Sequence, residues 1–296
     1  MERRRLGRTG LDVSVLGLGG SEIGYQRASP ATVARLLERA LDAGLNVIDT
    51  AECYDRSEEL IGRGLGSRRR ECLIFTKCGH PHGWGRGDWA PASLLTSIER
   101  SLRRLRTDHV DLIQLHSCSE AELRRGDVMR ALQTSRDRGL ARFVGYSGDG
   151  GAARYAVECG AFDTLQTSLS IADQEPLDLT LPLARARDMG VIAKRPIANA
   201  AWLARRVSRG AYEYEYWRRL QALGYDFLTG PEAVATALRF TLSAPGLHTA
   251  IVGTARPGRT EENARAVARG VLSESEIAAI RARWAEVADA SWGGQV

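Results

Sequence analysis

An eightfold alternation of short apolar runs and amphipathic segments constrains this chain more than any other feature. The runs predict buried strands, because Val, Ile and Leu dominate them, and each is followed by a stretch with helical spacing of its apolar residues. They lie at residues 15–20, 47–49, 73–77, 110–116, 142–147, 164–167, 191–194 and 249–252. Strands that alternate with helices predict an α/β fold with one parallel sheet, and eight repeats predict a (β/α)8 TIM barrel.

The segments around these strands complete the predicted architecture. Helices are expected at residues 31–42, 57–65, 91–105, 127–138, 151–159, 182–188, 231–242 and 260–268. We expect an N-terminal β-hairpin at residues 3–6 and 12–14 and an extra C-terminal helix at residues 274–290. A long connection is expected at residues 196–230. We therefore expect residues 1–296 to form a single barrel domain.

The composition of the chain limits the cellular compartments and the binding partners that can be expected. No apolar run is long enough to cross a bilayer, and the first residues lack the apolar segment of a signal peptide. Five scattered cysteines without a CxxC pair indicate reduced thiols, so we expect a cytoplasmic protein. The net charge of +5 is dispersed in short basic runs, which argues against a nucleic-acid partner and suits a phosphorylated cofactor or an anionic substrate.

The two lysines stand out against a background of arginine. Of the 41 basic residues only Lys77 and Lys194 are lysines, and both lie at the ends of apolar runs. A lysine amine can shift its pKa where a guanidinium cannot, so a retained lysine at a strand end indicates a functional position. Chance survival of two ordinary lysines is the alternative.

Four polar side chains of different chemistry follow the second, third and fourth predicted strands. Asp49 ends the second strand, Tyr54 lies on the loop after it, Lys77 ends the third strand and His116 ends the fourth. The carboxyl ends of barrel strands meet at one rim, where such barrels carry their chemistry. We therefore expect these four side chains to converge, although each alone would be an ordinary cap, loop or core residue.

Together these residues resemble the catalytic tetrad of the aldo-keto reductases. The resemblance covers nearly the whole chain and is carried by residues 46–51 with Tyr54, by residues 57–58, 76–77 and 111–116, and by Arg259 with Glu262 and Asn263. It implies a TIM barrel that transfers hydride between a nicotinamide dinucleotide and a carbonyl compound.

The chemistry of such a reaction explains the four residue types. The carbonyl oxygen must gain a proton as hydride reaches the carbon, and Tyr54 is expected to be the general acid. Free tyrosine has a pKa of about 10, and a buried Lys77 held by Asp49 is expected to lower it. His116 is expected to donate a hydrogen bond to the carbonyl oxygen.

The resemblance also implies where a cofactor binds. The positions it assigns to the dinucleotide are Gly20, Ser147, Gln166, Lys194, Arg195, Gly253, Thr254, Arg259, Glu262 and Asn263. Lys194 takes the place of an aromatic residue that commonly stacks on the nicotinamide. The loop at residues 252–259 enters a helix whose amides suit a phosphate, and its arginines favour NADP(H) over NAD(H), which stays possible.

The substrate side is predicted only as an aromatic pocket for a small-molecule carbonyl compound. Its expected members are Tyr25, Trp84, Trp89 and Trp202. An NAD-dependent polyol or sugar dehydrogenase and a cofactor-binding regulatory protein with little turnover are the alternatives. The oligomeric state, a monomer or a small homo-oligomer, is left open.

Two other interpretations are weaker. Residues 17–20 have the glycines of a Rossmann loop, with Asp49 as a ribose ligand, but Glu22 replaces the third glycine and a loop to Pro30 delays the helix. His80 and His82 lack a third ligand at matching spacing, so we expect no metal site and read them as exposed loop residues.

Overall fold

The computed structural model describes residues 1–295 and contains a closed barrel of parallel strands. Its strands are β3 (Leu16–Gly19), β4 (Val47–Asp49), β5 (Leu73–Cys78), β6 (Val110–His116), β7 (Ala141–Ser147), β8 (Thr164–Ser168), β9 (Gly190–Lys194) and β10 (Thr249–Gly253). Each pairs in parallel with the next along the chain, and β10 pairs with β3 to close the ring. The predicted (β/α)8 fold is confirmed.

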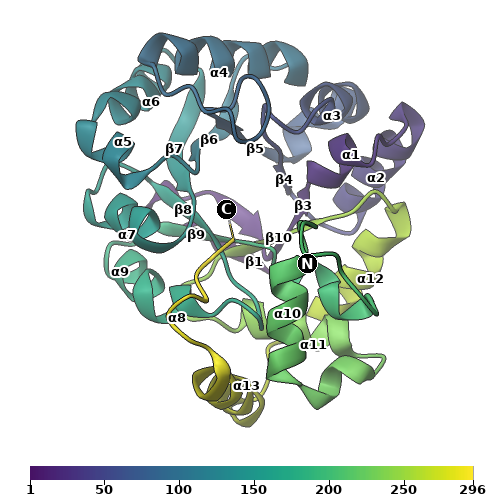
Figure 1. Cartoon of the computed structure of the whole chain (residues 1–296). Coiled ribbons are helices and arrows are strands. Elements are labelled where there is room, and N and C mark those ends of the chain that lie inside the picture. Colours follow the sequence, from purple (N-terminus) through teal and green to yellow (C-terminus); the bar gives the residue numbers. More distant parts are fainter. Residues whose placement is uncertain (296) are drawn as a thin grey trace.

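Helices surround the barrel (Figure 1). Those that follow barrel strands as predicted are α2 (Pro30–Asp42), α3 (Ser57–Leu65), α4 (Pro91–Leu105), α6 (Asp127–Asp137), α7 (Gly150–Glu158), α9 (Leu181–Ala186), α11 (Ala233–Leu242) and α12 (Pro257–Val267). The short helices α1 (Ser21–Tyr25), α5 (Glu120–Arg125) and α8 (Glu175–Leu179) lie in stretches for which no helix was expected. The last helix, α13 (Glu274–Val287), begins where predicted and ends earlier.

The connection at residues 196–230 is more ordered than the sequence indicated. It contains the 3₁₀ turns η3 (Ala198–Leu203) and η4 (Asp226–Thr229) and the helix α10 (Tyr214–Leu223). The buried residues Tyr216, Leu220 and Leu223 share one face of α10 and join an apolar cluster with Phe240 and Trp284, outside the barrel. Tertiary packing against α11 and α13 thus stabilises a helix that its own short pattern did not reveal.

The predicted N-terminal hairpin closes the amino-terminal end of the barrel. It consists of β1 (Arg3–Arg5) and β2 (Asp12–Ser14), paired antiparallel around the turn η1 (Gly7–Thr9). Leu6, Leu11 and Val13 are buried in one cluster with Phe75 and Leu112 from the barrel strands. This plug leaves the opposite, carboxyl-terminal rim as the open end.

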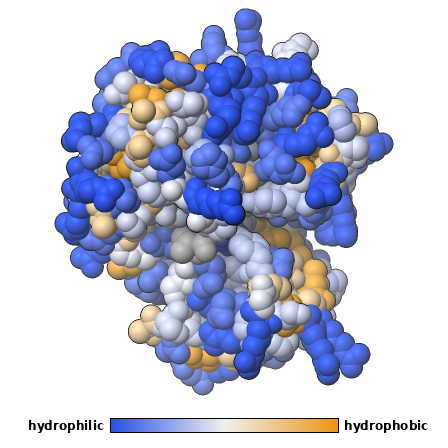
Figure 2. All heavy atoms as spheres, turned by 45° about the horizontal axis from the view of Figure 1, so that its top comes forward, coloured by the Kyte–Doolittle hydropathy of each residue, from blue (hydrophilic) through white to orange (hydrophobic). Residues whose placement is uncertain are grey.

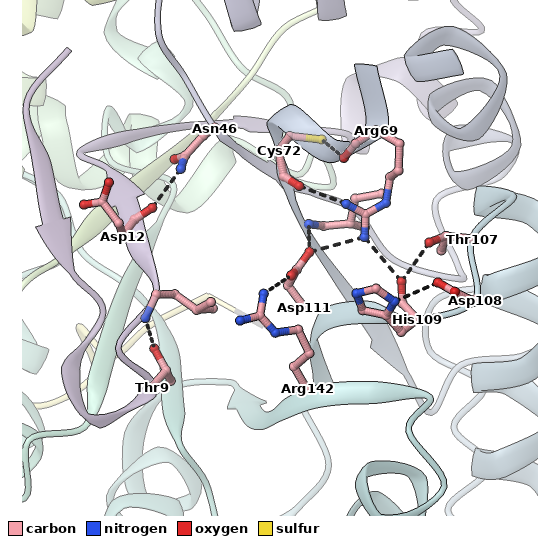
Figure 3. Close-up of polar contacts among 12 residues, drawn as sticks. Thr9, Asp12, Asn46, Arg69, Cys72, Thr107, Asp108, His109, Asp111 and Arg142 are labelled. Atoms are coloured by element: carbon pink, nitrogen blue, oxygen red, sulfur yellow. Dashed lines mark hydrogen bonds and ion pairs between the residues drawn. The ribbon is translucent and has the colours of Figure 1, made fainter. Parts of the chain in front are cut away.

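A polar network lies at the amino-terminal end of β5, β6 and β7 (Figure 3). The buried Asp111 carboxylate accepts the backbone N–H of Ile74 at 2.8 Å and the Arg142 guanidinium at 2.7 Å. Arg69 donates to the same carboxylate at 3.3 Å. Because these groups come from three neighbouring strands and the turn η2 (Gly66–Glu71), the network holds the strands in register.

Ser57 connects two strand ends at the open rim. Ser57 is the first residue of α3, as the predicted helix at residues 57–65 has it, and Arg56 precedes it as the cap residue. Its hydroxyl donates to the Gly20 carbonyl at 2.7 Å and accepts from Thr50 at 2.9 Å. It therefore ties the loop after β3 to the loop after β4, next to the expected site.

The surface is mostly polar. Hydrophilic side chains cover most of the face drawn in Figure 2, and apolar residues form smaller patches between them. Within residues 1–295 no helix combines the length and the apolar character required to span a membrane.

Replacing Asp111 with alanine is expected to destabilise the fold. It would leave the Ile74 N–H and two arginines without their buried acceptor, at a cost of about 2–3 kcal/mol in the free energy of unfolding. Urea denaturation measures the change, with Asp108→Ala as control because the Asp108 side chain is 93% exposed. Equal stability of the two variants would contradict a structural role for the network.

Candidate active site

A cleft of about 890 Å³ opens at the carboxyl-terminal rim of the barrel. The predicted site residues that line it are Gly20, Tyr25, Asp49, Tyr54, Lys77, Trp84, His116, Ser147, Gln166, Lys194, Arg195, Gly253, Thr254, Arg259 and Asn263. Because parallel strands all end at this rim, residues more than 200 positions apart share one cavity. Asp49, Tyr54, Lys77 and His116 therefore converge on one cavity, as their places at the strand ends predicted.

A buried ion pair forms the floor of the cleft. The Lys77 ammonium donates to Asp49 Oδ2 at 2.6 Å and to the Thr50 carbonyl at 2.8 Å. The Gln166 amide donates to the other Asp49 oxygen at 3.2 Å. Burial raises the pKa of Asp49, while the Lys77 charge and these hydrogen bonds oppose the rise. The pair is held by contacts from three strands and their loops.

Tyr54 stands above this pair. The Lys77 ammonium lies 5.4 Å from the Tyr54 ring centroid, and the rings of Tyr25 and His116 each approach it edge-on at 5.7 Å. Burial and the Asp49 carboxylate raise the pKa of the Tyr54 phenol well above its ordinary value. A lowered pKa was expected from the Lys77 charge, but burial of the phenol and the negative charge of Asp49 disfavour the phenolate more strongly. Tyr54 therefore holds its proton near neutral pH.

His116 is a neutral imidazole with one nitrogen already engaged. Burial and the Lys77 charge lower its pKa well below the ordinary value. Its Nδ1 lies 3.5 Å from the Cys53 thiol, and burial raises the pKa of that thiol to about 12, so the thiol keeps its proton and can donate to Nδ1. In the tautomer that accepts this hydrogen bond, the ring proton lies on Nε2, which is then free to donate in the cleft.

The loop between β5 and α4 is held from beneath by Glu52. This buried carboxylate accepts the backbone N–H groups of Gly79 and His80 at 2.7 and 2.8 Å and the Arg100 guanidinium at 2.6 Å. Glu52 lies within the motif around Asp49 and Tyr54, yet the sequence analysis assigned it no function. Its burial under the loop, which only the structure reveals, makes it a positioning residue.

His80 is buried, contrary to the expectation of an exposed loop histidine. Its Nε2 donates to the His116 carbonyl at 2.8 Å, and its ring packs against Trp84 and Trp89 at 4.8 and 5.4 Å between centroids. His82 is exposed as expected. Among residues 1–295, no three His, Cys, Asp or Glu side chains gather as a metal site would require.

Several groups in the cleft fit a dinucleotide. The Ser147 hydroxyl is buried without a hydrogen-bond partner in the described chain, and with the Gln166 amide it could satisfy a carboxamide. Thr254 accepts the N–H of Arg256 just before α12 begins, and Thr254, Arg259 and Asn263 line one end of the cleft beside the start of this helix. A phosphate-bearing ligand suits that end.

The end of β9 carries a second charge cluster. The Lys194 ammonium lies 2.9 Å from Asp149 Oδ2, and the Arg195 guanidinium lies 3.9 Å from the same oxygen. Arg195 also donates to the Tyr212 hydroxyl at 2.6 Å. Asp149 and Tyr212 were not predicted as site residues. Asp149 follows a barrel strand closely enough to have been suspected, whereas Tyr212 lies in a loop without a pattern.

Three predicted residues do not line the cleft. Glu262 is exposed and pairs with Arg259 at 2.8 Å, which can orient that guanidinium. Trp89 lies behind His80 rather than in the cavity. Trp202 packs against the apolar cluster of α10, α11 and α13, and its neighbour Leu203 lines the cleft instead.

The sequence matches the model of the Aldo/keto reductase family over residues 15–285. The uncharacterized oxidoreductase YqkF of Bacillus subtilis is 27% identical, with 95% of this chain and 96% of that protein aligned. L-galactose dehydrogenase of Arabidopsis thaliana is also 27% identical, over 90% of this chain and 88% of its own length.

Two solved structures resemble the chain along almost its whole length. The holo form of aldo-keto reductase AKR11C1 from Bacillus halodurans superposes with a TM-score of 0.83 at 26% identity and covers 96% of both chains. An aldo/keto reductase from Klebsiella pneumoniae in complex with NADP and acetate gives a TM-score of 0.74 at 25% identity, over 95% of this chain and 94% of that chain.

Replacing Glu52 with glutamine is expected to loosen the loop at residues 78–90. The amide oxygen is a weaker acceptor for Gly79 and His80 and loses the charge that pairs with Arg100, so exchange of these amide hydrogens should accelerate about tenfold. Hydrogen exchange with mass spectrometry measures peptides from this loop. Glu59→Gln on α3 is the matched control, and unchanged exchange in the Glu52 variant would refute the anchoring role.

Proposed function

The chain belongs to the aldo/keto reductase family, and on that premise we propose that it reduces an aldehyde or ketone to an alcohol with NADPH as hydride donor. The observation that carries the proposal is the arrangement of Tyr54 and His116 above the buried Lys77–Asp49 pair in one cleft. The same cleft contains the Ser147 hydroxyl, which has no partner among residues 1–295, and Arg256, Arg259 and Asn263 at the start of α12.

Tyr54 is proposed as the proton donor. A carbonyl oxygen that gains electron density needs a proton, and a phenol with a raised pKa is fully protonated near neutral pH. As the Tyr54 oxygen gives up its proton it becomes anionic, and the neighbouring Lys77 charge then stabilises that anion in a site of low dielectric constant. Asp49 holds Lys77 charged and in place.

His116 is proposed to orient the carbonyl group. Its Nε2–H is directed by the Cys53 contact at Nδ1, and its uncharged state keeps it from competing with Tyr54 as an acid. Trp84 packs at 4.7 Å from the His116 ring, and Tyr25 packs on Tyr54, so apolar surface flanks both donors. Excluding water from this space strengthens each hydrogen bond to the substrate oxygen.

The dinucleotide supplies the hydride, for which no side chain of the protein can substitute. Ser147 and Gln166 are proposed to hold its carboxamide, and Arg259 and Asn263 its adenosine end. Arg256, Arg259 and the amides of α12 favour the additional phosphate of NADPH over NADH. The NADP-bound relative from Klebsiella pneumoniae supports this preference.

Sugar oxidation is the second candidate. L-galactose dehydrogenase is among the relatives, and aromatic rings such as Tyr25 and Trp84 can pack on the apolar face of a sugar. Oxidation would use the same residues in reverse, with Tyr54 accepting the proton that it gives up in reduction. Carbonyl reduction stays the first proposal because the arginines at the adenosine end favour NADPH, whereas the alternative enzyme uses NAD.

Tyr54→Phe should lower kcat for carbonyl reduction by about 10²–10⁴-fold, because the general acid is lost while the ring remains. Binding of NADPH, measured by fluorescence titration, should stay unchanged. Tyr155→Phe on α7 is the control, since that ring packs against Arg124 outside the cleft. A Tyr54 variant with turnover close to the wild type would exclude Tyr54 as the proton donor.

NADPH should bind more tightly than NADH, by about tenfold or more, because the 2′-phosphate gains charge-assisted hydrogen bonds. Tryptophan fluorescence quenching gives both dissociation constants. Arg259→Met should remove most of the difference, whereas Arg103→Met, an exposed arginine of α4, should not. Tighter binding of NADH to the unaltered protein would overturn the assigned preference.

A further inference from the structure

Lys194 is the second of the chain's two lysines, and it has no part in the proton transfer proposed above. It ends β9, lines the same cleft as Tyr54 and His116, and its side chain is only 16% exposed. Its ammonium is paired with Asp149 at 2.9 Å. Burying a charge costs free energy because the charge loses its hydration, and a charge held in such a place acts strongly on any ligand that binds beside it.

The cluster of Lys194, Arg195 and Asp149 carries one positive charge in excess. Two cations face one carboxylate, and Asp149 also accepts the Ser168 N–H, so its charge is already well satisfied. Asp173 lies nearby, but burial raises its pKa to about 8, so it adds only a small part of a negative charge near neutral pH; Lys194, whose pKa burial lowers to about 8, stays mostly charged there. The floor of the cleft is therefore electropositive on this side.

The electrostatic field of this cluster extends to Asp49 and His116, where the reaction is proposed to occur. Burial is the largest influence on both groups, raising the pKa of Asp49 and lowering that of His116, and the Lys194 charge adds a smaller downward contribution to each. Gln166, which binds Asp49, lies on β8 next to β9 and lines the same cavity. A nicotinamide ring close enough to serve a carbonyl group between Tyr54 and His116 would feel the same field.

We propose that the Lys194–Arg195–Asp149 cluster makes this cleft bind reduced NADPH more tightly than oxidised NADP⁺. The inference rests on the proposed function. The nicotinamide ring is neutral when reduced; after the hydride and its electron pair have moved to a carbonyl carbon, and a proton has moved from Tyr54 to the oxygen, the ring carries one positive charge. Excess positive charge in a partly buried site repels that product and not the reactant.

The consequence is a built-in direction for the reaction. Repulsion of the oxidised ring favours release of the spent cofactor and disfavours its use in the reverse reaction. Lys194 acts here through its charge, without touching the reacting atoms, so it is a positioning and specificity residue. The negative charge of Asp149 offsets part of the Lys194 charge and so weakens the repulsion of the oxidised ring.

The experiment measures the dissociation constants of NADPH and NADP⁺ separately, by titration of tryptophan fluorescence and by calorimetry. Lys194→Met removes one positive charge and should tighten NADP⁺ binding relative to NADPH by about tenfold. Asp149→Asn removes the compensating negative charge and should shift the ratio the other way, while the asparagine oxygen can still accept the Ser168 N–H. Lys194→Arg keeps the charge and should keep the ratio.

Opposite shifts distinguish charge from structure, because a variant that merely distorts the cleft would weaken both nucleotides together. The Arg103→Met variant, which loses an exposed charge outside the cleft, should match the wild-type ratio. An unchanged ratio in both Lys194→Met and Asp149→Asn, or a shift in the same direction, would overturn this inference while NADPH binding upheld the proposed function. If the wild type bound neither nucleotide, both proposals would fall.

Discussion

The buried contact between the Lys77 ammonium and the Asp49 carboxylate is the interaction on which the open rim of this barrel depends. The two opposite charges are buried away from water, and the Lys77 Nζ–Asp49 Oδ2 distance is 2.6 Å. The Thr50 carbonyl accepts a second hydrogen bond from Lys77, and the Gln166 amide donates one to Asp49. Such a pair is stable only where its surroundings are rigid, because losing either partner would leave a buried charge alone. The closed ring of strands supplies that rigidity. The raised pKa of Tyr54 and the neutral state of His116 both follow from charges held in so little water.

The loops around this pair are themselves held by buried charges. Glu52 anchors the loop with His80 and Trp84, and Asp149 binds the strand ends of β8 and β9. Both carboxylates accept hydrogen bonds from backbone N–H groups, so they fix the position of the main chain itself. The cleft is thus bounded by two anchored sides, one aromatic and one cationic. The proposed reaction places a carbonyl substrate beside the first side and the nicotinamide end of the cofactor beside the second.

The positions of the two lysines in the cleft give a physical reason for the scarcity of lysine elsewhere in the chain. Arginine serves for the ion pairs at the surface, whereas both lysines line the cleft. A compact ammonium can sit against a carboxylate in a narrow space and respond to burial; at Lys194 burial lowers the pKa to about 8. Both lysines place a compact ammonium against a buried carboxylate, Lys77 against Asp49 and Lys194 against Asp149.

The sequence by itself determined the order of the barrel strands and their helices, the class of the barrel and the position of Asp49, Tyr54, Lys77 and His116 at its rim. These follow from local patterns: apolar runs specify buried strands, and in a parallel barrel every strand end points to one rim. Only the tertiary structure decided the helix α10, the burial of His80, the anchoring by Glu52 and Asp149, and the presence of Tyr212 and Leu203 in the cleft in place of Trp202. It also reversed the expected pKa shift of Tyr54. Those features depend on how deeply each group is removed from water and on which charges from distant strands surround it, and no local pattern in the chain records either quantity.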